Sequence, residues 1–227
     1  NNAILRDSGS ELNFYPGVPE IFDTTRSVIG NNKSFAERGI RVEHYIVSTG
    51  MAEVIRGSAA SNHVDHIWGC ELIETRNAEG NPVIGELGYT IDNTSKTRAL
   101  FEINKGVPVE EGIDVNARVP KNLRRVRFEN MIYIADGPSD VPAFSVVKHY
   151  GGSTFAVYPK GNEAAFAQVE QLREDGRIDM YAEADYSAGT TANMWITHKV
   201  AEIAQRIVSE EKQRLEAAVS TAPKHLT

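Results

Sequence analysis

Two aspartates at the end of a predicted strand are the residues best suited to carry chemistry. Asp136 follows the continuous apolar run Met131–Ala135, and Asp140 comes four residues later, after Gly137. Such a run predicts a strand that is buried on both faces and carries Asp136 to the edge of a sheet. Ionised carboxylates there suit Mg²⁺, which binds one or two carboxylates, waters and phosphate oxygens. The alternative is an Asp-Gly turn in which Asp140 caps the next helix, and the two roles are compatible.

A second candidate position is formed by Ser48, Thr49 and Gly50, which follow the β-branched and aromatic run Val42–Val47. The two hydroxyls can donate hydrogen bonds to an anion, and the glycine lets the backbone approach it closely. A helix expected from about Met51 to Gly57 would point its first N–H groups the same way. The alternative is an ordinary turn and helix cap, in which these residue types are common.

Lys96 is the third candidate because of its place near the start of a helix predicted over Thr94–Asn104. A cation there opposes the helix dipole, which favours acidic residues in the first turn. A carboxylate or phosphate partner would explain the position of this lysine. The alternative is an exposed lysine balanced by Asp92.

The elements that must position these residues alternate between strand and helix. Gly106 is a stop signal for the helix that carries Lys96. Further strands are predicted over 67–74, 154–158 and 180–184, and further helices after Pro19, over 140–150 and 163–172, and from about 191. The alternation is typical of an α/β protein with a doubly wound parallel sheet, which binds ligands beyond the carboxyl ends of its strands. A hairpin insertion is predicted over Arg76–Tyr89, and Val107–Glu129 is predicted to be mostly irregular.

Composition excludes several classes of protein. Of the 227 residues 41% are hydrophobic and 24% are charged, as in soluble globular domains. A net charge of −7 argues against a nucleic-acid partner. We interpret the basic run of Lys121, Arg124, Arg125 and Arg127 as a solvated loop. The sequence contains neither a signal peptide nor an apolar run of roughly 18 residues, so we expect no membrane partner and a cytoplasmic location.

Cysteine and histidine add little chemistry. The single cysteine, Cys70, excludes an intrachain disulfide and lies in an apolar stretch, so we expect a buried structural thiol. His63 and His66 are the nearest approach to a metal-ligand pair, but no acid or cysteine stands at matching spacing, which disfavours zinc. No phosphate-binding or dinucleotide-binding glycine motif follows a strand.

Three segments, taken in order, resemble motifs of the haloacid dehalogenase superfamily of hydrolases. Ile46–Gly50 resembles the second motif, Lys96 the third, and Ile132–Asp140 the fourth. Pro16-Gly17-Val18, ahead of the second motif, is similar to the same feature in phosphoserine-phosphatase-like members. The resemblance covers roughly Tyr15 to Tyr158.

The resemblance implies a Rossmann-like core that acts as a magnesium-dependent phosphatase on a small phosphorylated metabolite. Such hydrolases transfer the phosphoryl group to an aspartate and form an aspartyl-phosphate. The implied catalytic residues are Ser48, Lys96 and Asp140. The implied phosphate-binding residues are Ser48, Thr49, Gly50 and Lys96. Asp136 and Asp140 are the implied metal residues; Asp136 would bind Mg²⁺, and Asp140 would also orient Lys96 or a metal-bound water.

The first motif of the superfamily, a nucleophilic aspartate with a second aspartate two residues later, is missing. The acid nearest the start is Asp7, and Gly9 stands two residues after it. We expect residues 1–14 to be the remnant of a helical cap, residues 15–216 to be the core domain and residues 217–227 to be a flexible tail. The nucleophile strand is then expected upstream of Asn1, and the sheet lacks a central strand.

Two other functions are compatible with the same residues. A non-catalytic protein could keep the phosphate and metal pocket without the nucleophile. A receiver-like domain phosphorylated on Asp136 is disfavoured, because Ser48 and Thr49 stand where receivers have a further acidic pair. The resemblance leaves the substrate undefined, because in this superfamily the cap selects it, and the sequence does not indicate an oligomeric state.

Overall fold

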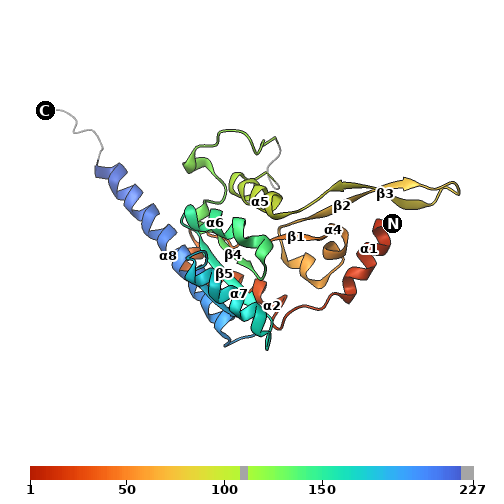
Figure 1. The fold of residues 1–227 in the computed structure, drawn as a ribbon. Coiled ribbons are helices and arrows are strands. Elements are labelled where there is room, and N and C mark those ends of the chain that lie inside the picture. The colour runs from red at the N-terminus through yellow and green to blue at the C-terminus, as the bar shows by residue number, and fades with distance from the viewer. Residues whose placement is uncertain (108–111, 221–227) are drawn as a thin grey trace.

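A computed structural model describes residues 1–107 and 112–220 and confirms the α/β class. Two three-stranded sheets form within this part of the chain (Figure 1). The first has the order β1 (Tyr45–Met51), β2 (His66–Arg76) and β3 (Pro82–Tyr89); the second has the order β4 (Ile132–Ala135), β5 (Ser153–Tyr158) and β6 (Met180–Glu183). The second sheet is entirely parallel, whereas the first is mixed because β3 runs antiparallel to β2. The described strands therefore do not form the single continuous parallel sheet that strand–helix alternation predicts.

The helices cover the sheets on two sides. They are α1 (Asn2–Ser8), α2 (Glu20–Gly30), α3 (Lys33–Ala36), α4 (Ala52–Arg56), α5 (Asn93–Lys105), α6 (Val141–His149), α7 (Glu163–Glu174) and α8 (Thr191–Ser220). α2 packs against α8, and α5 packs against α6. In Figure 1, α8 extends beyond the sheets at one end of the molecule and the β2–β3 hairpin extends away at the other. No helix in the described ranges is both long and apolar enough to cross a membrane.

Local sequence explains the bounds of α5. The side chain of Asp92 accepts hydrogen bonds from the backbone N–H groups of Thr94 and Ser95, and the Ser95 hydroxyl accepts one from the Asp92 N–H. This capping box satisfies donors that the first helical turn leaves unpaired. Gly106 ends the helix with φ of 88°, a left-handed conformation that glycine adopts without steric cost. The helix predicted from the sequence is confirmed, and Lys96 lies in its first turn.

The predicted hairpin is also confirmed. β2 and β3 pair in antiparallel register, and the turn between them is closed by the Asn77 N–H donating to the Asn81 carbonyl. α1 lies beside the hairpin, where Asn2 Nδ2 donates to the Leu72 carbonyl at 3.0 Å (Figure 1). Residues 2–11 are therefore helical, in α1 and a 3-10 turn, and α1 contacts the first sheet.

Two expectations about individual segments need correction. β1 starts and ends later than predicted, so Ser48, Thr49 and Gly50 lie within the strand and not beyond it. α8 continues to Ser220, so residues 217–220 of the predicted flexible tail are helical, and residues 221–227 lie outside the described part. The stretch predicted to be mostly irregular is so where the structure describes it, with short 3-10 turns at Lys121–Leu123 and Phe128–Asn130, and residues 108–111 lie outside the described part.

The strand β4 is less buried than its sequence predicts. All four of its residues are only partly buried, whereas Thr154, Phe155, Ala156 and Val157 of its neighbour β5 are each at most 3% exposed. β5 has a strand on each side, while β4 pairs with β5 alone among the described strands. The apolar run therefore has the composition of a central strand but the exposure of an edge strand.

A close backbone contact fixes the loop before α2. The Tyr186 N–H donates to the Pro16 carbonyl at 2.7 Å, and the neighbouring Gly17 has φ of 80°. A Cβ atom added to Gly17 would lie 2.2 Å from the Tyr186 carbonyl carbon. Only glycine fits this contact, which holds the start of α2 against the loop that follows β6.

We predict that Gly17→Ala destabilises the fold more than Gly80→Ala. Gly80 has a similar φ of 82°, but an added Cβ would meet no atom within 4 Å. Both variants incur the left-handed backbone cost of roughly 1–2 kcal/mol. Gly17→Ala adds an overpacking cost of about 1–3 kcal/mol. Urea unfolding followed by circular dichroism measures both losses, and equal losses would contradict the contact at Tyr186.

Candidate functional site

Lys96 and Asp140 form a buried ion pair at the carboxyl end of β4. Lys96 is 6% exposed and Asp140 is 4% exposed. The Lys96 Nζ lies 2.7 Å from Asp140 Oδ1 and donates to the Ser139 hydroxyl at 3.0 Å. The alternative of an exposed lysine balanced by Asp92 is therefore wrong, since Asp92 caps α5. A buried carboxylate compensates the cation in the unfavourable first turn.

Tyr133 completes the hydrogen bonding of Asp140. Its phenol donates to Asp140 Oδ1 at 2.5 Å. Burial, followed by the negative charge of Asp140, raises the pKa of Tyr133, so the phenol remains a neutral donor. The helix-cap alternative for Asp140 is not observed, because its side chain makes no capping bond although the residue occupies the cap position of α6. Asp140 is instead the residue that positions Lys96.

Asp136 is exposed at the end of β4 and lies near two tyrosines. Burial raises the pKa of Tyr186, and the charge of Asp136 raises it further. The pKa of Tyr15 is raised by the same two causes in the same order. An anionic Asp136 thus faces neutral phenols, and no positive side chain contributes to either shift.

Ser48 and its neighbours end up in an extended conformation. The Ser48 hydroxyl accepts a hydrogen bond from the Gly50 N–H at 3.0 Å, and the Thr49 carbonyl accepts one from the Cys70 thiol at 3.3 Å. α4, which follows, has only five residues. The expected anion site at the start of the helix after Gly50 therefore loses the contribution of a long helix. The hydroxyls and backbone groups at the end of β1 remain. Cys70 is half-buried and hydrogen-bonded, not fully buried as expected.

Five of the six predicted site residues line one cavity of about 1100 Å³, namely Ser48, Thr49, Lys96, Asp136 and Asp140. Gly50 is not part of its wall. The sequence interpretation did not single out Tyr15, Tyr133 or Tyr186, which line the same cavity. Tyr133 lies in the predicted strand that leads to Asp136, and this position in the sequence is the signal that could have pointed to it. Tyr186 is brought to the site by tertiary contacts alone.

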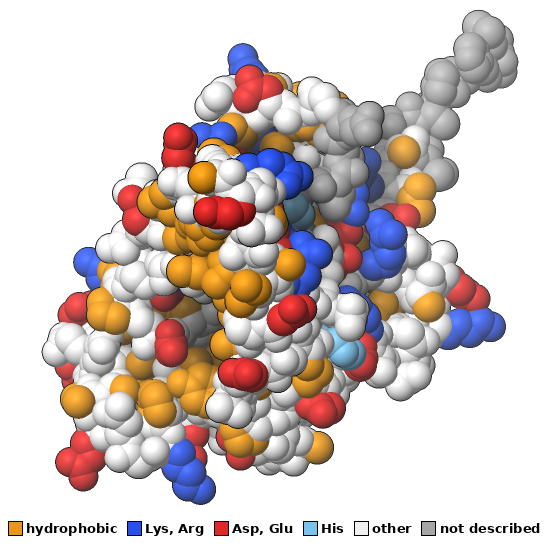
Figure 2. Space-filling view, turned by 90° about the vertical axis from the view of Figure 1, so that its right-hand side faces the viewer, with side chains coloured by type: hydrophobic (Ala, Val, Ile, Leu, Met, Phe, Trp, Pro, Cys, Tyr) orange, Lys and Arg blue, Asp and Glu red, His pale blue; other side chains and the backbone are white. Residues whose placement is uncertain are grey.

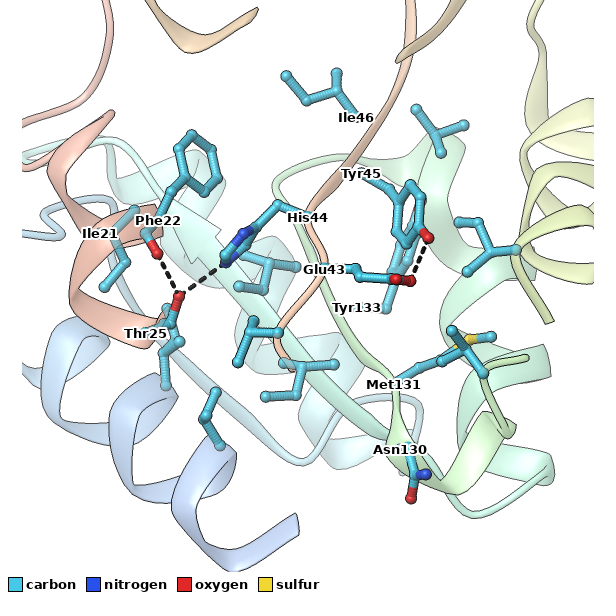
Figure 3. Close-up of a pocket in the computed structure, with 18 of the residues that line it drawn as sticks. Ile21, Phe22, Thr25, Glu43, His44, Tyr45, Ile46, Asn130, Met131 and Tyr133 are labelled. Atoms are coloured by element: carbon cyan, nitrogen blue, oxygen red, sulfur yellow. Dashed lines mark hydrogen bonds between the residues drawn. The ribbon is translucent and has the colours of Figure 1, made fainter. Parts of the chain in front are cut away.

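The cavity lies between the two sheets. At its far end, Arg125 donates to the carboxylate of Glu43, which also accepts from the Tyr45 phenol at 2.6 Å. Figure 3 shows part of the cavity wall. The start of β1 and the residues before it, Glu43 to Ile46, lie in the middle. Ile21, Phe22 and Thr25 of α2 lie to one side, and Asn130, Met131 and Tyr133, in or just before β4, lie to the other. The polar site is therefore one end of a long, mostly apolar cavity.

The described residues supply only part of a magnesium site. No group of three or more His, Cys, Asp or Glu side chains that could hold a metal is found among them. Asp140 is held by Lys96 and Tyr133, which leaves Asp136 as the one exposed carboxylate of the pair. Magnesium binds one or two carboxylates together with waters and substrate oxygens. Asp136 fits this donor type, and a further carboxylate from elsewhere would complete it.

On the face of the molecule that carries the hairpin, charges of both signs are interspersed. Figure 2, which looks onto the side of the molecule that carries the hairpin, shows acidic, basic and hydrophobic side chains mixed over that face. In the predicted basic run, Lys121 pairs with Glu129 at 2.9 Å and Arg127 pairs with Glu210 at 2.6 Å. The run therefore lies in a partly exposed loop before β4, as interpreted from the sequence, and its cations are paired with acidic side chains.

Comparison with known proteins places the chain in a family without assigning an activity. No protein-family model matches the sequence. An uncharacterized protein of Borreliella burgdorferi is 34% identical over 213 residues, a match that covers 88% of this chain and 71% of that protein. The chain belongs to the same family as this Borreliella protein. The shared ancestry supports a shared fold, and any function must be argued from the site.

We predict that Lys96→Met lowers the free energy of unfolding by about 3–5 kcal/mol, because it leaves the Asp140 carboxylate buried without its cation. Lys33→Met is the matched control. The Lys33 side chain is 88% exposed and pairs with Glu37 at 3.7 Å, so its loss should cost less than about 0.5 kcal/mol. Chemical unfolding of both variants measures the difference. A small loss for Lys96→Met would contradict the buried pair.

His44, in the wall of the cavity, has a lowered pKa that makes the stability of the fold depend on pH. Its Nε2 lies 2.8 Å from the Thr25 hydroxyl. The pKa of His44 is lowered to about 4, mainly by burial and then by the positive charge of Arg26, while Asp65 and Asp23 oppose the shift. The unfolded chain, in which a histidine has a pKa near 6.5, therefore binds more protons than the folded chain between about pH 4 and 6.5.

We predict that stability falls with acidification through this pH range and that His44 accounts for about 2 kcal/mol of the loss between pH 7 and pH 5. His44→Gln should remove that part of the pH dependence, because glutamine does not titrate. Urea unfolding of both proteins at pH 5, 6 and 7 measures it. Burial also lowers the pKa of His66, so His66→Gln is measured in parallel. Identical pH slopes for wild type and His44→Gln would disprove the assignment to His44.

Proposed function

We propose that this chain forms the core of a magnesium-dependent phosphatase-type hydrolase of the haloacid dehalogenase type, acting on a small phosphorylated metabolite. The observation that carries the proposal is the buried ammonium group of Lys96 at the mouth of the cavity, held by Asp140 and Ser139. Ser48 and Asp136 line the same cavity. A fixed cation beside a hydroxyl and a free carboxylate is the arrangement that phosphoryl transfer requires, because its catalysis rests on positioning and charge stabilisation.

Charge balance supports a metal as the additional partner. Lys96 and Asp140 together are neutral, so the pair alone offers an incoming phosphate dianion little net attraction. Mg²⁺ bound at Asp136 would supply the missing positive charge and bridge to phosphate oxygens. Within the chain, Asp140 keeps Lys96 in place, Lys96 points its charge at the reacting group, and the Ser48 hydroxyl donates to a phosphoryl oxygen.

The covalent step needs an aspartate that we expect upstream of residue 1. Its carboxylate oxygen would attack phosphorus as the ester P–O bond breaks, and the leaving oxygen would take a proton from a second aspartate acting as general acid. Water would then hydrolyse the aspartyl-phosphate, releasing inorganic phosphate and restoring the carboxylate. Residues 1–227 alone should therefore bind substrate without turning it over.

We predict that the longest gene product hydrolyses p-nitrophenyl phosphate with Mg²⁺ and that Asp136→Asn lowers kcat/KM about 100-fold or more, because the amide cannot replace the anionic metal ligand. Asp136 is exposed, so the variant should fold normally. Asp7→Asn is the control, since Asp7 is also exposed but lies on α1.

Two outcomes would overturn this assignment. Full magnesium-dependent turnover by the 25.0 kDa chain would refute the upstream nucleophile. Magnesium-dependent phosphate binding by the longest gene product without hydrolysis would favour the non-catalytic alternative. That alternative keeps Lys96, Asp136 and Ser48 as a binding pocket, and the same titration with inorganic phosphate detects it.

A further inference from the structure

Two tyrosines stand beside Asp136 at the polar end of the cavity. Tyr15 lies in the segment before α2, and Tyr186 follows β6. Both line the cavity together with Lys96 and Asp136. After burial, the charge of Asp136 is the next cause of the raised pKa of both phenols, which agrees with two side chains close to that carboxylate. The proposed phosphoryl transfer leaves both tyrosines without a role.

Backbone contacts fix the positions of the two tyrosines. The Tyr186 N–H donates to the Pro16 carbonyl at 2.7 Å, and Gly17 approaches the Tyr186 backbone so closely that a Cβ atom would not fit. The Val18 N–H donates to the Tyr15 carbonyl at 3.2 Å, which closes the turn that carries Tyr15. Tyr186 also packs against a buried apolar cluster. Both positions are therefore set before a ligand binds, which lowers the entropic cost of binding.

The side chains of Tyr15 and Tyr186 are available to a ligand. Within the described ranges, neither tyrosine contacts another aromatic ring or makes a side-chain hydrogen bond. Tyr133, by contrast, packs edge-on against a phenylalanine, and its phenol donates to Asp140. Tyr15 is 37% exposed, and its neighbour Phe14 adds a third ring to the same wall. Planar aromatic ligands pair with ring faces of this kind.

The charges of the cavity wall set the orientation of a phosphate ester. Lys96 stands at the polar end, whereas Arg41 and Arg125 pair with Glu43 at the other end. The phosphate group is therefore drawn to the end that holds Lys96. The organic part of the ester then lies against the aromatic side chains that line this end.

We propose that Tyr15 and Tyr186 select the substrate, and that the substrate is a phosphate monoester whose alcohol carries a planar aromatic ring. The phosphate lies beside Lys96 and Ser48, and the ring stacks on the two tyrosines. The phosphate end rests on the proposed function, whereas the ring end is argued from the tyrosines themselves. Tyr15 and Tyr186 determine specificity and take no part in the transfer of the phosphoryl group.

Binding of matched phosphonates to residues 1–227 tests the preference for an aromatic ring. Methylphosphonate, cyclohexylphosphonate and phenylphosphonate carry the same phosphonate group on a stable C–P bond, so none of them is hydrolysed. With Mg²⁺ present, isothermal titration calorimetry should show phenylphosphonate binding about tenfold more tightly than methylphosphonate and about threefold more tightly than cyclohexylphosphonate, because stacking adds to the burial of apolar area. Equal affinities of phenylphosphonate and cyclohexylphosphonate would overturn the proposal.

Matched variants locate the ring. Tyr15→Ala should lower the ratio of phenylphosphonate to methylphosphonate affinity about fivefold, whereas Tyr15→Phe should preserve the ratio because the ring remains. Tyr89→Ala is the control, since Tyr89 is 39% exposed but lies on β3 outside the cavity, so the ratio should not change. Tyr186→Leu should also lower the ratio. Circular dichroism checks the fold of each variant, and the Tyr15 variants decide the matter if Tyr186→Leu does not fold. An unchanged ratio in Tyr15→Ala would overturn the proposal.

The same titrations separate the ring site from the phosphatase proposal. If all the phosphonates bind equally and only with Mg²⁺, the aromatic preference fails while the phosphatase proposal stands. If phenylphosphonate is preferred through Tyr15 but binds equally with and without Mg²⁺, the magnesium-dependent phosphatase proposal fails while the ring site stands. If no phosphonate binds, the ring site fails, and phosphatase assays of the longest gene product still decide the function.

Discussion

The buried pair of Lys96 and Asp140 ties together the two halves of the molecule. Lys96 belongs to α5, which follows the first sheet, and Asp140 stands between β4 and α6 of the second sheet. A buried cation and a buried anion are each costly alone, so each holds the other in place. Tyr133 restricts the carboxylate further. The carboxyl ends of β1 and β4 meet across this pair, and the candidate site depends on it.

A second link between the two halves lies at the opposite end of the cavity. The Glu43 and Arg125 pair joins the segments that lead into β1 and β4, while helices cover the space between the sheets on both sides. The result is a cavity with polar ends, apolar walls and two open strand edges. The open edge of β4 has a visible effect on burial. β4 and β5 are both apolar, but β5 pairs on both edges and is buried, whereas β4 pairs on one edge and is only partly buried.

The proposed phosphoryl-transfer chemistry follows from the groups at the polar end of this cavity. Asp140 serves as the positioning partner of Lys96 and has little capacity left for a metal, while Asp136 is exposed beside neutral tyrosines. The polar end therefore has one fixed cation, one free carboxylate and the strand-end hydroxyls. A divalent cation at Asp136 would add the positive charge that an incoming phosphoryl group needs at this end of the cavity, which is the basis of the proposed hydrolase.

The sequence by itself determined the local features. The apolar run before Asp136, the end of α5 at Gly106 and the hairpin turn around Asn77 are set by neighbouring residues, and they were predicted because side-chain pattern and turn chemistry act over short distances. Tertiary structure alone decided the rest. A carboxylate partner for Lys96 was expected, but the burial of its pair with Asp140 was not. That burial, the position of Tyr186 near Asp136 and the division of the strands into two sheets depend on contacts between distant segments, and such contacts leave no periodic signal in a single sequence.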